Sequence, residues 1–573
     1  MIRPASGAPR RRPRGISTVA CAIAATVLSA GPALADWPSD PTVNLPLTTS
    51  TSVVTRYATL SDGAGGVIAV TFDLATNPAR VLAYRVDAAG VVRWPAAGVA
   101  VGVVGSNSTN DAPAALSDGL GGLFVVWAGA SDSSGADLFA QRLDGNGVVL
   151  WGSAVELTRL SGSRASPAMV SDGAGGLIVA WRDFHSGHFS DRAQRVDGAG
   201  NILWAAIGVP LLSLPSAYGP RPVSDDAGGA IVALTPFTGS GIRVVLQRIG
   251  ASGTTLWGAT GIEVSLYSSL HPAITADAAG GAIVAWDEYQ AYPARKNAQR
   301  VDANGVPQWL AGGVTVAPSV SASTYDTTVV TAAGSHGAVI AWYDSRPGFY
   351  GPHAQRLDGS GAALWGATGV AIDSTSHLQI GLSVVVNAAG ASTLLWSGRR
   401  DSTYDIFAQS LSAAGAPLWA PLGVAVGTAR GDQILPQLTA STAGGTIATW
   451  LDGRTASGLA LYAQHLGASG ALDVALPPAT GVRLAGLAPS PWSVAGSAAV
   501  RFALPAPGLV RVSIVDLAGR TVRVLEDGSA PAGESVARWD GRDAAGQLAR
   551  PGLYLVRLQT AGRTYARKAV LLQ

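Results

Sequence analysis

The sequence is almost without cysteine: Cys21 is the only one among 573 residues, and it lies in the first 35. Disulfides, thiolate catalysis and cysteine-ligated metal sites are therefore excluded from the rest of the chain. Charged residues make up only 13%, which does not fit a disordered chain. We find no Gly-x-Ser-x-Gly, His-Glu-x-x-His or phosphate-loop motif, so we expect no catalytic residue, cofactor or metal.

Basic residues are concentrated at the start of the chain. Five arginines and no acid occur in residues 1–35, and they outweigh the whole formal net charge of +2. No basic stripe with interleaved aromatic residues follows, so we expect no nucleic-acid partner.

Residues 1–35 have the three parts of a secretory signal peptide. Residues 1–14 are basic, residues 16–30 are apolar and small, and Ala33, Leu34 and Ala35 precede a cleavage site before Asp36. The alternative is an uncleaved membrane anchor, but Gly31 and Pro32 favour cleavage. We expect a secreted, extracellular or cell-surface protein with no membrane span after cleavage, and the periplasm is the alternative compartment.

The chain is rich in glycine (72 residues), proline (33) and apolar residues (48%), which is typical of a turn-rich all-β protein. A unit exemplified by residues 171–204 recurs every 52 to 56 residues. The last residue of its glycine turn marks eight copies: Gly66, Gly122, Gly176, Gly229, Gly281, Gly337, Ala391 and Gly445. A period of this length indicates a repeat architecture.

Each unit contains four candidate strands, which in the third copy are residues 167–170, 177–181, 192–196 and 202–204 with a continuation to 209. The second is apolar throughout, so it must be buried on both faces of its sheet. Four strands in about 54 residues predict the blade of a β-propeller, because the rungs of a β-helix are much shorter. We therefore expect an eight-bladed β-propeller over residues 36–475.

A tryptophan marks the fourth strand of seven copies, at Trp94, Trp151, Trp204, Trp257, Trp309, Trp365 and Trp419. The eighth copy has none, but Trp37 stands at the matching distance before Trp94. We therefore expect the N-terminal strand to complete the last blade, since an open ring would leave two unpaired strand edges.

The segment Ala-Gln-Arg-Leu-Asp-Gly-Asn-Gly-Val-Val-Leu-Trp, residues 140–151, resembles the tryptophan-docking motif of eight-bladed quinoprotein-type propellers. The resemblance implies that an alanine on the third strand and a tryptophan on the fourth lock adjacent blades. It does not imply the enzyme, because the calcium and cofactor site of a quinoprotein dehydrogenase often includes adjacent cysteines.

Two kinds of connection lie on one face of such a ring: those between second and third strands, and those that lead to the next blade. They are long and variable here, so we expect a binding surface on that face. The candidate ligand-binding residues are Asp183, His185, His188, Asp344, Arg346, Arg400, Asp401, Asp452 and Arg454. Because Asp or Asp-x-Arg recurs with the period, a structural role as loop cap and local ion pair is the favoured interpretation. A flexible loop gives His185, His188 and Asp191 no fixed geometry for a metal.

After a proline-rich linker, residues 476–487, the period ends and short alternating strands predict a small β-sandwich over residues 488–573. Its clearest strands are residues 498–504, 509–516, 521–526, 535–539, 552–559 and 563–572. The motifs Pro-Ser-Pro (489–491), Val-Asp-Leu-Ala-Gly-Arg-Thr (515–521), Trp-Asp-Gly-Arg-Asp (539–543) and Gly-Leu-Tyr (552–554) resemble the Ig-like domain of the FlgD type. This domain also resembles C-terminal sorting domains of type IX secretion, which implies a spacer, attachment or export element that contacts secretion or cell-envelope machinery.

Two hypotheses of function follow from these patterns. The first is a non-enzymatic binding or scaffold protein that presents the long-loop face to a protein or glycan. The alternative is a polysaccharide hydrolase or lyase that draws its acid and base from Asp183, Asp344, Asp401 or Asp452. Two carboxylates at about 5 to 10 Å in one deep axial pocket would favour the hydrolase.

Overall fold

The structure is a computed structural model, and its described residues consist of strands, turns and irregular segments without a helix. They are 37–48, 53–104, 111–132, 135–158, 162–185, 187–289, 294–318, 328–344, 350–375, 379–399, 402–441, 445–455, 458–472, 482–488, 492–493, 498–504, 508–530 and 533–572. The predicted signal peptide and the first half of the predicted linker, residues 476–481, lie outside them. The all-β prediction is confirmed.

The described residues before 473 form eight four-stranded antiparallel sheets, numbered here in chain order. In seven of them the strands follow the chain: β2 (Val54–Ser61), β3 (Val67–Asp73), β4 (Arg80–Val86) and β5 (Val99–Val103); β6 (Ala114–Ser117), β7 (Leu123–Asp132), β8 (Gly135–Leu143) and β9 (Val155–Glu156); β10 (Ser163–Ser171), β11 (Leu177–His185), β12 (His188–Val196) and β13 (Val209–Pro210); β14 (Arg221–Ser224), β15 (Ala230–Leu234), β18 (Val245–Ile249) and β19 (Ile262–Glu263); β20 (Ser269–Ala276), β21 (Ala282–Glu288), β22 (Arg295–Val301) and β23 (Val314–Ala317); β24 (Val329–Ala332), β25 (Ala338–Asp344), β26 (Gly351–Leu357) and β27 (Val370–Ala371); β28 (Gln379–Val386), β29 (Ser392–Gly398), β30 (Asp405–Leu411) and β31 (Val424–Gly427). The eighth joins β32 (Gln433–Ala440), β33 (Thr446–Thr455) and β34 (Gly458–Leu466) to β1 (Leu45–Pro46). A short hairpin, β16 (Phe237–Thr238) and β17 (Gly241–Ile242), extends from the fourth sheet.

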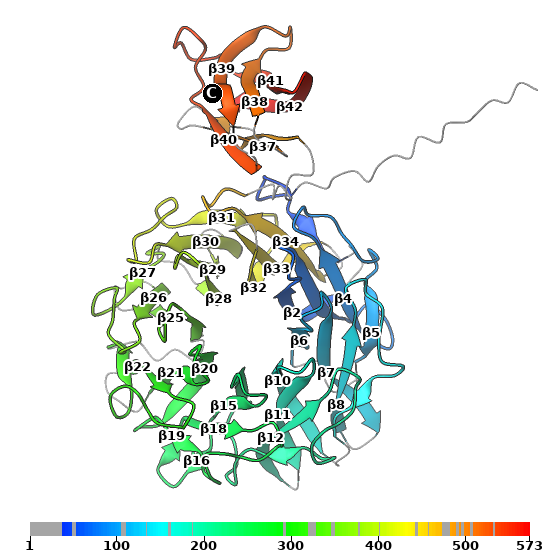
Figure 1. Ribbon diagram of the computed structural model, residues 1–573, viewed down its shortest axis with the longest axis vertical. Coiled ribbons are helices and arrows are strands. Elements are labelled where there is room, and N and C mark those ends of the chain that lie inside the picture. Colours follow the sequence, from blue (N-terminus) through cyan, green and yellow to red (C-terminus); the bar gives the residue numbers. More distant parts are fainter. Residues whose placement is uncertain are drawn as a thin grey trace, which may run out of the picture. The chain divides into compact units, whose positions relative to one another are not determined.

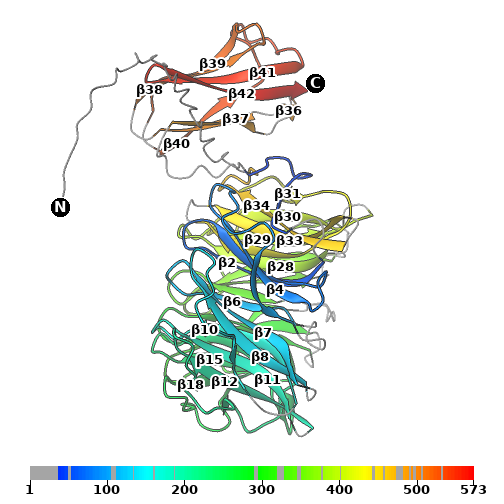
Figure 2. The same cartoon turned by 90° about the vertical axis from the view of Figure 1, so that its right-hand side faces the viewer.

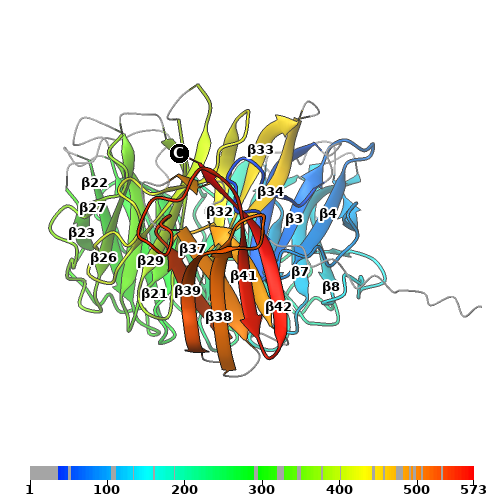
Figure 3. The same cartoon turned by 90° about the horizontal axis from the view of Figure 1, so that it is seen from above.

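The eight sheets are arranged around a central opening, with the first strand of each sheet innermost (Figure 1). Each inner strand contacts the next, in the order β2, β6, β10, β14, β20, β24, β28 and β32, and β32 contacts β2 again. The strands run from one face of this ring to the other (Figure 3). One face, the turn face, carries the glycine turns such as residues 171–176, and the opposite loop face carries longer connections such as residues 211–220.

The second strands are buried as the apolar pattern predicts. All five residues of β15 are buried, and so are all seven of β25 and of β29. Neighbouring sheets cover both faces of these strands, which explains why their sequences do not alternate.

The recurring polar and aromatic residues hold each sheet to the next, as the third copy shows. Asp172 Oδ1 accepts hydrogen bonds from the turn nitrogens of Ala174 and Gly176, at 2.8 and 2.7 Å. Its Oδ2 pairs with Arg195, whose Nη1 donates to the carbonyl of Ala251 in the following copy (3.0 Å). Trp204 Nε1 donates to the same carbonyl (3.0 Å). One carbonyl of the next sheet thus receives two donors from the preceding one.

A glycine of each following turn makes room for the docking tryptophan. Gly253 has φ +84°, and a Cβ on it would lie 2.9 Å from Trp204 Cγ. The same approach joins eight pairs: Trp37–Gly90, Trp94–Gly147, Trp151–Gly200, Trp204–Gly253, Trp257–Gly305, Trp309–Gly361, Trp365–Gly415 and Trp419–Gly470.

Two details of the repeat differ from the prediction. Residues 202–204 form no strand but a single bridge from Ile202 to Val196, and the fourth strand is β13. The expected polar loop at residues 182–191 is largely a continuation of the β11–β12 hairpin, which is paired as far as His185 and His188. Cross-strand aromatic pairing of Phe184 with Phe189, at 4.7 Å between ring centroids, stabilises this extension.

The C-terminal part is a β-sandwich, and its two sheets are drawn in Figure 2. One sheet consists of β35 (Arg483–Ala488), β37 (Ala498–Leu504) and β40 (Gly533–Trp539). The other consists of β36 (Trp492–Ser493), β42 (Arg563–Leu572), β41 (Gly552–Thr560), β38 (Gly508–Val515) and β39 (Thr521–Ala530). Trp539 is fully buried in the core between them, together with Phe502 and Ile514, which agrees with its predicted core role.

Candidate functional site

Asp183 lies inside a buried ionic network. Its Oδ1 accepts a hydrogen bond from Arg164 Nε at 3.0 Å, and its Oδ2 lies 3.3 Å from Arg192 Nε. Arg164 also pairs with Asp137 of the preceding sheet through Nη1, at 2.8 Å. Asp183 and the Arg164 side chain are both 0% exposed. Arg164 therefore connects two sheets, and Asp183 is one of its two carboxylate partners.

Asp344 and Asp452 also bond within the scaffold. Each is 0% exposed, and each accepts a hydrogen bond from the indole of the tryptophan two residues earlier, Trp342 (3.1 Å) or Trp450 (2.9 Å). The structural interpretation of the recurring Asp accounts for these contacts.

Arg454 links the N-terminal segment to the eighth sheet. It donates to both carboxylate oxygens of Asp452, at 2.8 and 2.7 Å, and to the carbonyls of Thr42 and Val43, at 3.0 and 2.7 Å. Its Nη2 also donates to Asn44 Oδ1 at 2.8 Å. The Arg454 guanidinium thus makes five hydrogen bonds to other residues of this chain, and its role here is structural.

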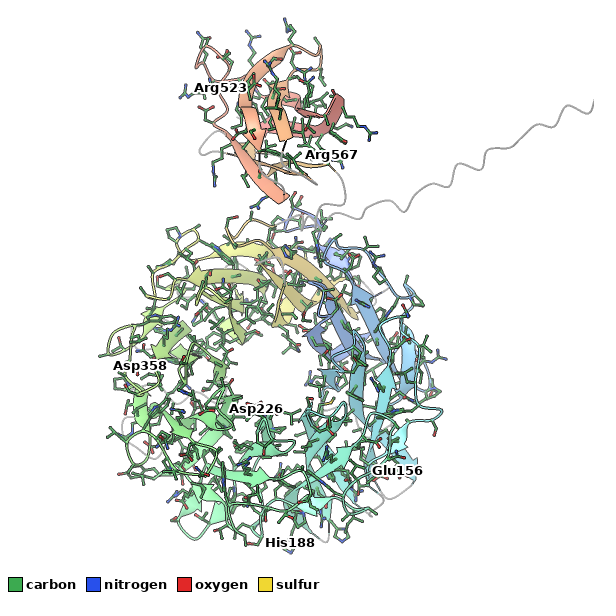
Figure 4. The ribbon with its side chains drawn as sticks, in the orientation of Figure 1. Glu156, His188, Asp226, Asp358, Arg523 and Arg567 are labelled. Atoms are coloured by element: carbon green, nitrogen blue, oxygen red, sulfur yellow. The ribbon has the colours of Figure 1, made fainter. Side chains whose placement is uncertain are left out.

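Of the remaining predicted site residues, the structure describes His185 and His188. His185 and His188 are register partners in the β11–β12 hairpin, and His188 projects from the outer margin of the ring, whereas Asp226 lies at the central opening (Figure 4). Arg346, Arg400 and Asp401 lie outside the described residues. Among the residues that the structure describes, no group of three or more His, Cys, Asp or Glu could hold a metal ion.

A cavity of about 540 Å³ opens at the loop-face end of four consecutive inner strands. Ala168 of β10, Arg221 and Pro222 of β14, residues 271–274 of β20 and residues 328–330 at β24 form its walls, together with Tyr218 and Gly219. It is mostly apolar, with Arg221, His271, Tyr218 and Thr328 as polar members. Such a cavity is within the size range of ligand pockets.

An ion cluster beneath the cavity holds two of its wall residues. Asp287 binds His271 Nδ1 at 3.3 Å, and it pairs with the fully buried Lys296. Thr328 Oγ1 donates to Asp287 Oδ1 at 3.1 Å and accepts from Lys296 Nζ at 3.0 Å. Burial alone would raise the pKa of Asp287, but Lys296 and His271 lower it below its ordinary value. Asp287 is therefore ionised, and its contacts fix the positions of His271 and Thr328.

Arg221 departs from the repeat. Counted by strand register, the equivalent inner-strand positions hold Ala58, Ala114, Ala168 and Ala273, and also Val329, Ser383 and Gln437. Arg221 is the one charged residue in this series. Arg221, Tyr218, His271 and Thr328 are not among the predicted site residues, because they lie outside the second-to-third connections; an alignment of the first strands contains the signal for Arg221.

Several exposed aromatic side chains lie in the same region. Among the residues whose burial the structure describes, every exposed Phe, Tyr or Trp belongs to one set, here called the aromatic patch: Phe184, Phe189, Tyr218, Phe237, Tyr267 and Tyr289. All six lie at the loop face of the third to fifth sheets, in the hairpin ends and connections there.

Hydrogen bonds order the connections that carry the aromatic patch. Ser216 N donates to the carbonyl of Phe189 (3.0 Å), Phe237 N donates to that of Pro215 (2.9 Å), and Tyr289 N donates to that of Ser268 (3.3 Å). The rings of Tyr218 and His271 lie 5.4 Å apart at the cavity. The aromatic patch and the cavity are therefore adjacent.

Asp191, in β12 beside these connections, gives a pH-dependent prediction. It is 3% exposed, and burial raises its pKa to about 7 against the lowering effect of Ser216 and Arg182. The folded state therefore binds the proton more tightly than the unfolded state, so stability declines as pH rises from about 4 to about 7. Each pKa unit corresponds to about 1.4 kcal/mol.

We expect Asp191→Asn to remove this dependence, so that the variant gains stability relative to the wild type between pH 4.5 and 8. Thermal unfolding across that range measures the difference. The exposed Asp226→Asn variant is the control and should stay parallel to the wild type. A constant difference between Asp191→Asn and wild type at every pH would contradict the prediction.

A second cavity, of about 470 Å³, lies on the turn face between the seventh and eighth sheets. Its walls include Asn387, Ser410, Trp419 and Ala468. Five other copies have an Asp–Arg pair at the positions of Asn387 and Ser410. The cavity therefore results from the shorter Ser410 side chain, and it has no charged wall residue.

No helix in the described ranges is long and apolar enough to span a membrane.

Solved structures resemble the chain weakly. A protein of unknown function from Dyadobacter fermentans has 9% identity and a TM-score of 0.36, covering 74% of this chain and 98% of that one. An α-L-arabinanase from Penicillium chrysogenum has 11% identity and a TM-score of 0.29, covering 53% and 93%. PorZ, a surface component of the type-IX secretion system of Porphyromonas gingivalis, has 11% identity and a TM-score of 0.23, covering 92% and 100%. Values this low do not bear on ligand or activity.

No curated protein matches the chain. A family model does match part of it: residues 491–563 match the FlgD Ig-like domain. The C-terminal part of the chain therefore contains an Ig-like domain of the FlgD type.

Proposed function

We propose that residues 36–475 form a closed eight-bladed β-propeller that binds a partner protein through its loop face, and that the Ig-like domain serves as a spacer, attachment or sorting element. The observation that carries the binding role is the aromatic patch. Exposed aromatic side chains confined to one region mark interaction sites, and tyrosine and arginine are enriched among residues that dominate binding energy.

The closed ring is supported by the N-terminal strand. Leu45 and Pro46 pair with Ala463 and Tyr462, and Trp37 docks on Gly90 as the other seven tryptophans dock on theirs. Such a ring gives a rigid platform for the loop face.

The Ig-like match and the predicted signal peptide support a location outside the cytoplasm, as a secreted or surface protein. Contact of the Ig-like domain with secretion or cell-envelope machinery is part of the same proposal.

A polysaccharide hydrolase is the second candidate. It requires two carboxylates in one pocket, but no Asp or Glu is among the described residues that line the 540 Å³ cavity. Glycan binding without hydrolysis also fits exposed rings. The experiment below therefore distinguishes a protein-binding face from a glycan-binding face and from a hydrolase.

We expect Phe237→Ser combined with Tyr267→Ser to weaken partner binding about tenfold or more, because both rings would leave the interface. The probe is a set of random linear peptides selected on the chain lacking residues 1–35, with affinities measured by fluorescence anisotropy. Leu120→Ser with Leu256→Ser is the matched control, because these exposed leucines (80% and 51%) lie on the turn face.

Equal binding of selected peptides by the aromatic variant and the control would overturn the protein-binding face. A glycan array gives the remaining outcome: binding of a glycan that depends on Phe237 and Tyr267, with no peptide selected, would replace the protein partner by a sugar. Release of reducing ends from that glycan would favour the hydrolase.

A further inference from the structure

We infer that the 540 Å³ cavity of the loop face is a carboxylate-binding site that takes an acidic group carried on an apolar segment of the partner. This inference rests on the proposed function, because it assigns the centre of the same face a specific ligand chemistry.

The cavity has one strong cation and no anion in its described wall. Arg221 lines it, and no hydrogen bond or ion pair joins the Arg221 side chain to another described residue. Arg221 is solvent-accessible although protein surrounds it, as expected inside an opening. Burial lowers its pKa, and the neighbouring Asp111 acts in the opposite direction, but a guanidinium stays protonated in proteins. The cavity therefore attracts an anion.

Asp111 does not use up this charge. Its Oδ2 accepts the hydrogen bond of Ser166 N at 2.7 Å, which ties it to the bulge at the start of β10. The other nearby acid, Asp287, is paired with Lys296 and His271. Among the described residues, these two acids are thus engaged with other groups, and Arg221 keeps its donors.

A carboxylate suits this arrangement better than a larger anion. A guanidinium binds a carboxylate through two parallel hydrogen bonds, and the cavity offers Arg221 as its single strong cation. The Tyr218 and His271 rings stand at the same wall, 5.4 Å apart, and their edges are half-exposed. The Tyr218 hydroxyl and the His271 ring nitrogens are further polar groups in the wall that contains the Arg221 guanidinium.

The rest of the wall is apolar. Pro222, Pro272, Ile274, Val329 and Val330 surround the polar members. Burial of apolar ligand atoms against apolar walls favours binding, while a few polar groups fix the orientation of the ligand. The ligand therefore combines one carboxylate with apolar neighbours, as at an Asp or Glu flanked by apolar residues or at an apolar peptide C-terminus.

The absence of this charge elsewhere in the ring makes the site specific. Four equivalent positions are alanine, so scaffold formation does not require an arginine here. Of the eight equivalent positions, only that of Arg221 holds an arginine, and it lies at the cavity, beside the aromatic patch.

The test uses the peptides selected on the full mature chain. In each, Asp, Glu and the C-terminal carboxylate are neutralised one at a time, by Asn, Gln and amide. We expect one neutralisation per peptide to weaken binding about tenfold to a hundredfold. Arg221→Gln should weaken the unmodified peptide by the same factor, and the neutralised peptide should then bind the variant and the wild type equally.

Arg56→Gln is the matched control, because Arg56 is an exposed arginine of the inner strand β2 and does not line the cavity. It should change affinity less than twofold. Arg221→Lys keeps the charge but loses the paired donors, and it should recover only part of the affinity.

Two outcomes separate this inference from the proposed function. In the first, the peptides bind and their affinity depends on Phe237 and Tyr267, but neutralising the carboxylate weakens binding to Arg221→Gln as much as binding to the wild type. The carboxylate site is then refuted, while the binding face stands. If no peptide depends on either, both proposals fail. The neutralisation that matters, side chain or C-terminus, identifies the source of the carboxylate.

Discussion

Replacing Trp37 by alanine is expected to destabilise the whole array of eight sheets. Trp37 is 1% exposed, its Nε1 donates to the carbonyl of Ala88 at 3.0 Å, and its ring packs on Gly90 of the first sheet. Truncating a buried tryptophan costs about 3 to 5 kcal/mol. The loss falls at the joint between the last and first sheets, where β1 is separated from its partner β34 by more than 400 residues of chain.

The control is Trp151→Ala, which removes an equivalent docking contact to Gly200 between consecutive sheets. Both variants should melt several degrees lower. Only Trp37→Ala, or deletion of residues 36–47, should also expose the edge of β34 and associate with rising concentration, because a free strand edge templates pairing with another chain. Light scattering after size exclusion checks this. A deleted protein that melts at the wild-type temperature as a monomer would contradict closure by the N-terminal strand.

The repeat could be predicted because its determinants are local. Glycine turns, apolar second strands and docking tryptophans are each defined within about 35 residues, as Asp172, Gly176 and Trp204 illustrate, and the register of most strands follows from them. The hairpin at residues 182–191 was missed because its alternating polar residues have the composition of a loop. Its pairing depends on Phe184 and Phe189.

The cavity could not be predicted in the same way. Ala168, Arg221, Ala273 and Val329 belong to four different copies, and they share a wall only because their strands are neighbours in the ring. The candidate residues Asp183, Asp344 and Asp452 were chosen for their position after a strand-ending tryptophan. That position places them among buried partners rather than at the surface, since strand pairing continues past the tryptophan.

Arg164→Met is expected to have the other large effect on stability. The arginine lies between Asp137 and Asp183, at 2.8 and 3.0 Å, with no exposed side-chain surface. Its removal takes this cation away from two buried carboxylates, those of Asp137 and Asp183, and Asp183 still lies 3.3 Å from Arg192 Nε. Loss of one member of a buried ionic network costs about 3 to 5 kcal/mol, because the remaining charge is desolvated without compensation.

Arg93→Met is the matched control, since Arg93 pairs with Asp87 at a site where its side chain is 56% exposed, and such pairs contribute about 1 kcal/mol or less. Adding Asp137→Asn and Asp183→Asn to Arg164→Met should restore much of the lost stability, because the two negative charges that Arg164 offsets are then removed as well. Denaturant unfolding of the four proteins measures these differences. If Arg164→Met unfolds at the same midpoint as Arg93→Met, the network does not hold the second and third sheets together, and Asp183 regains its place as a candidate ligand contact. If the expected loss and recovery occur, Asp183 is accounted for by the scaffold, and the search for ligand contacts moves to Arg221 and the aromatic patch.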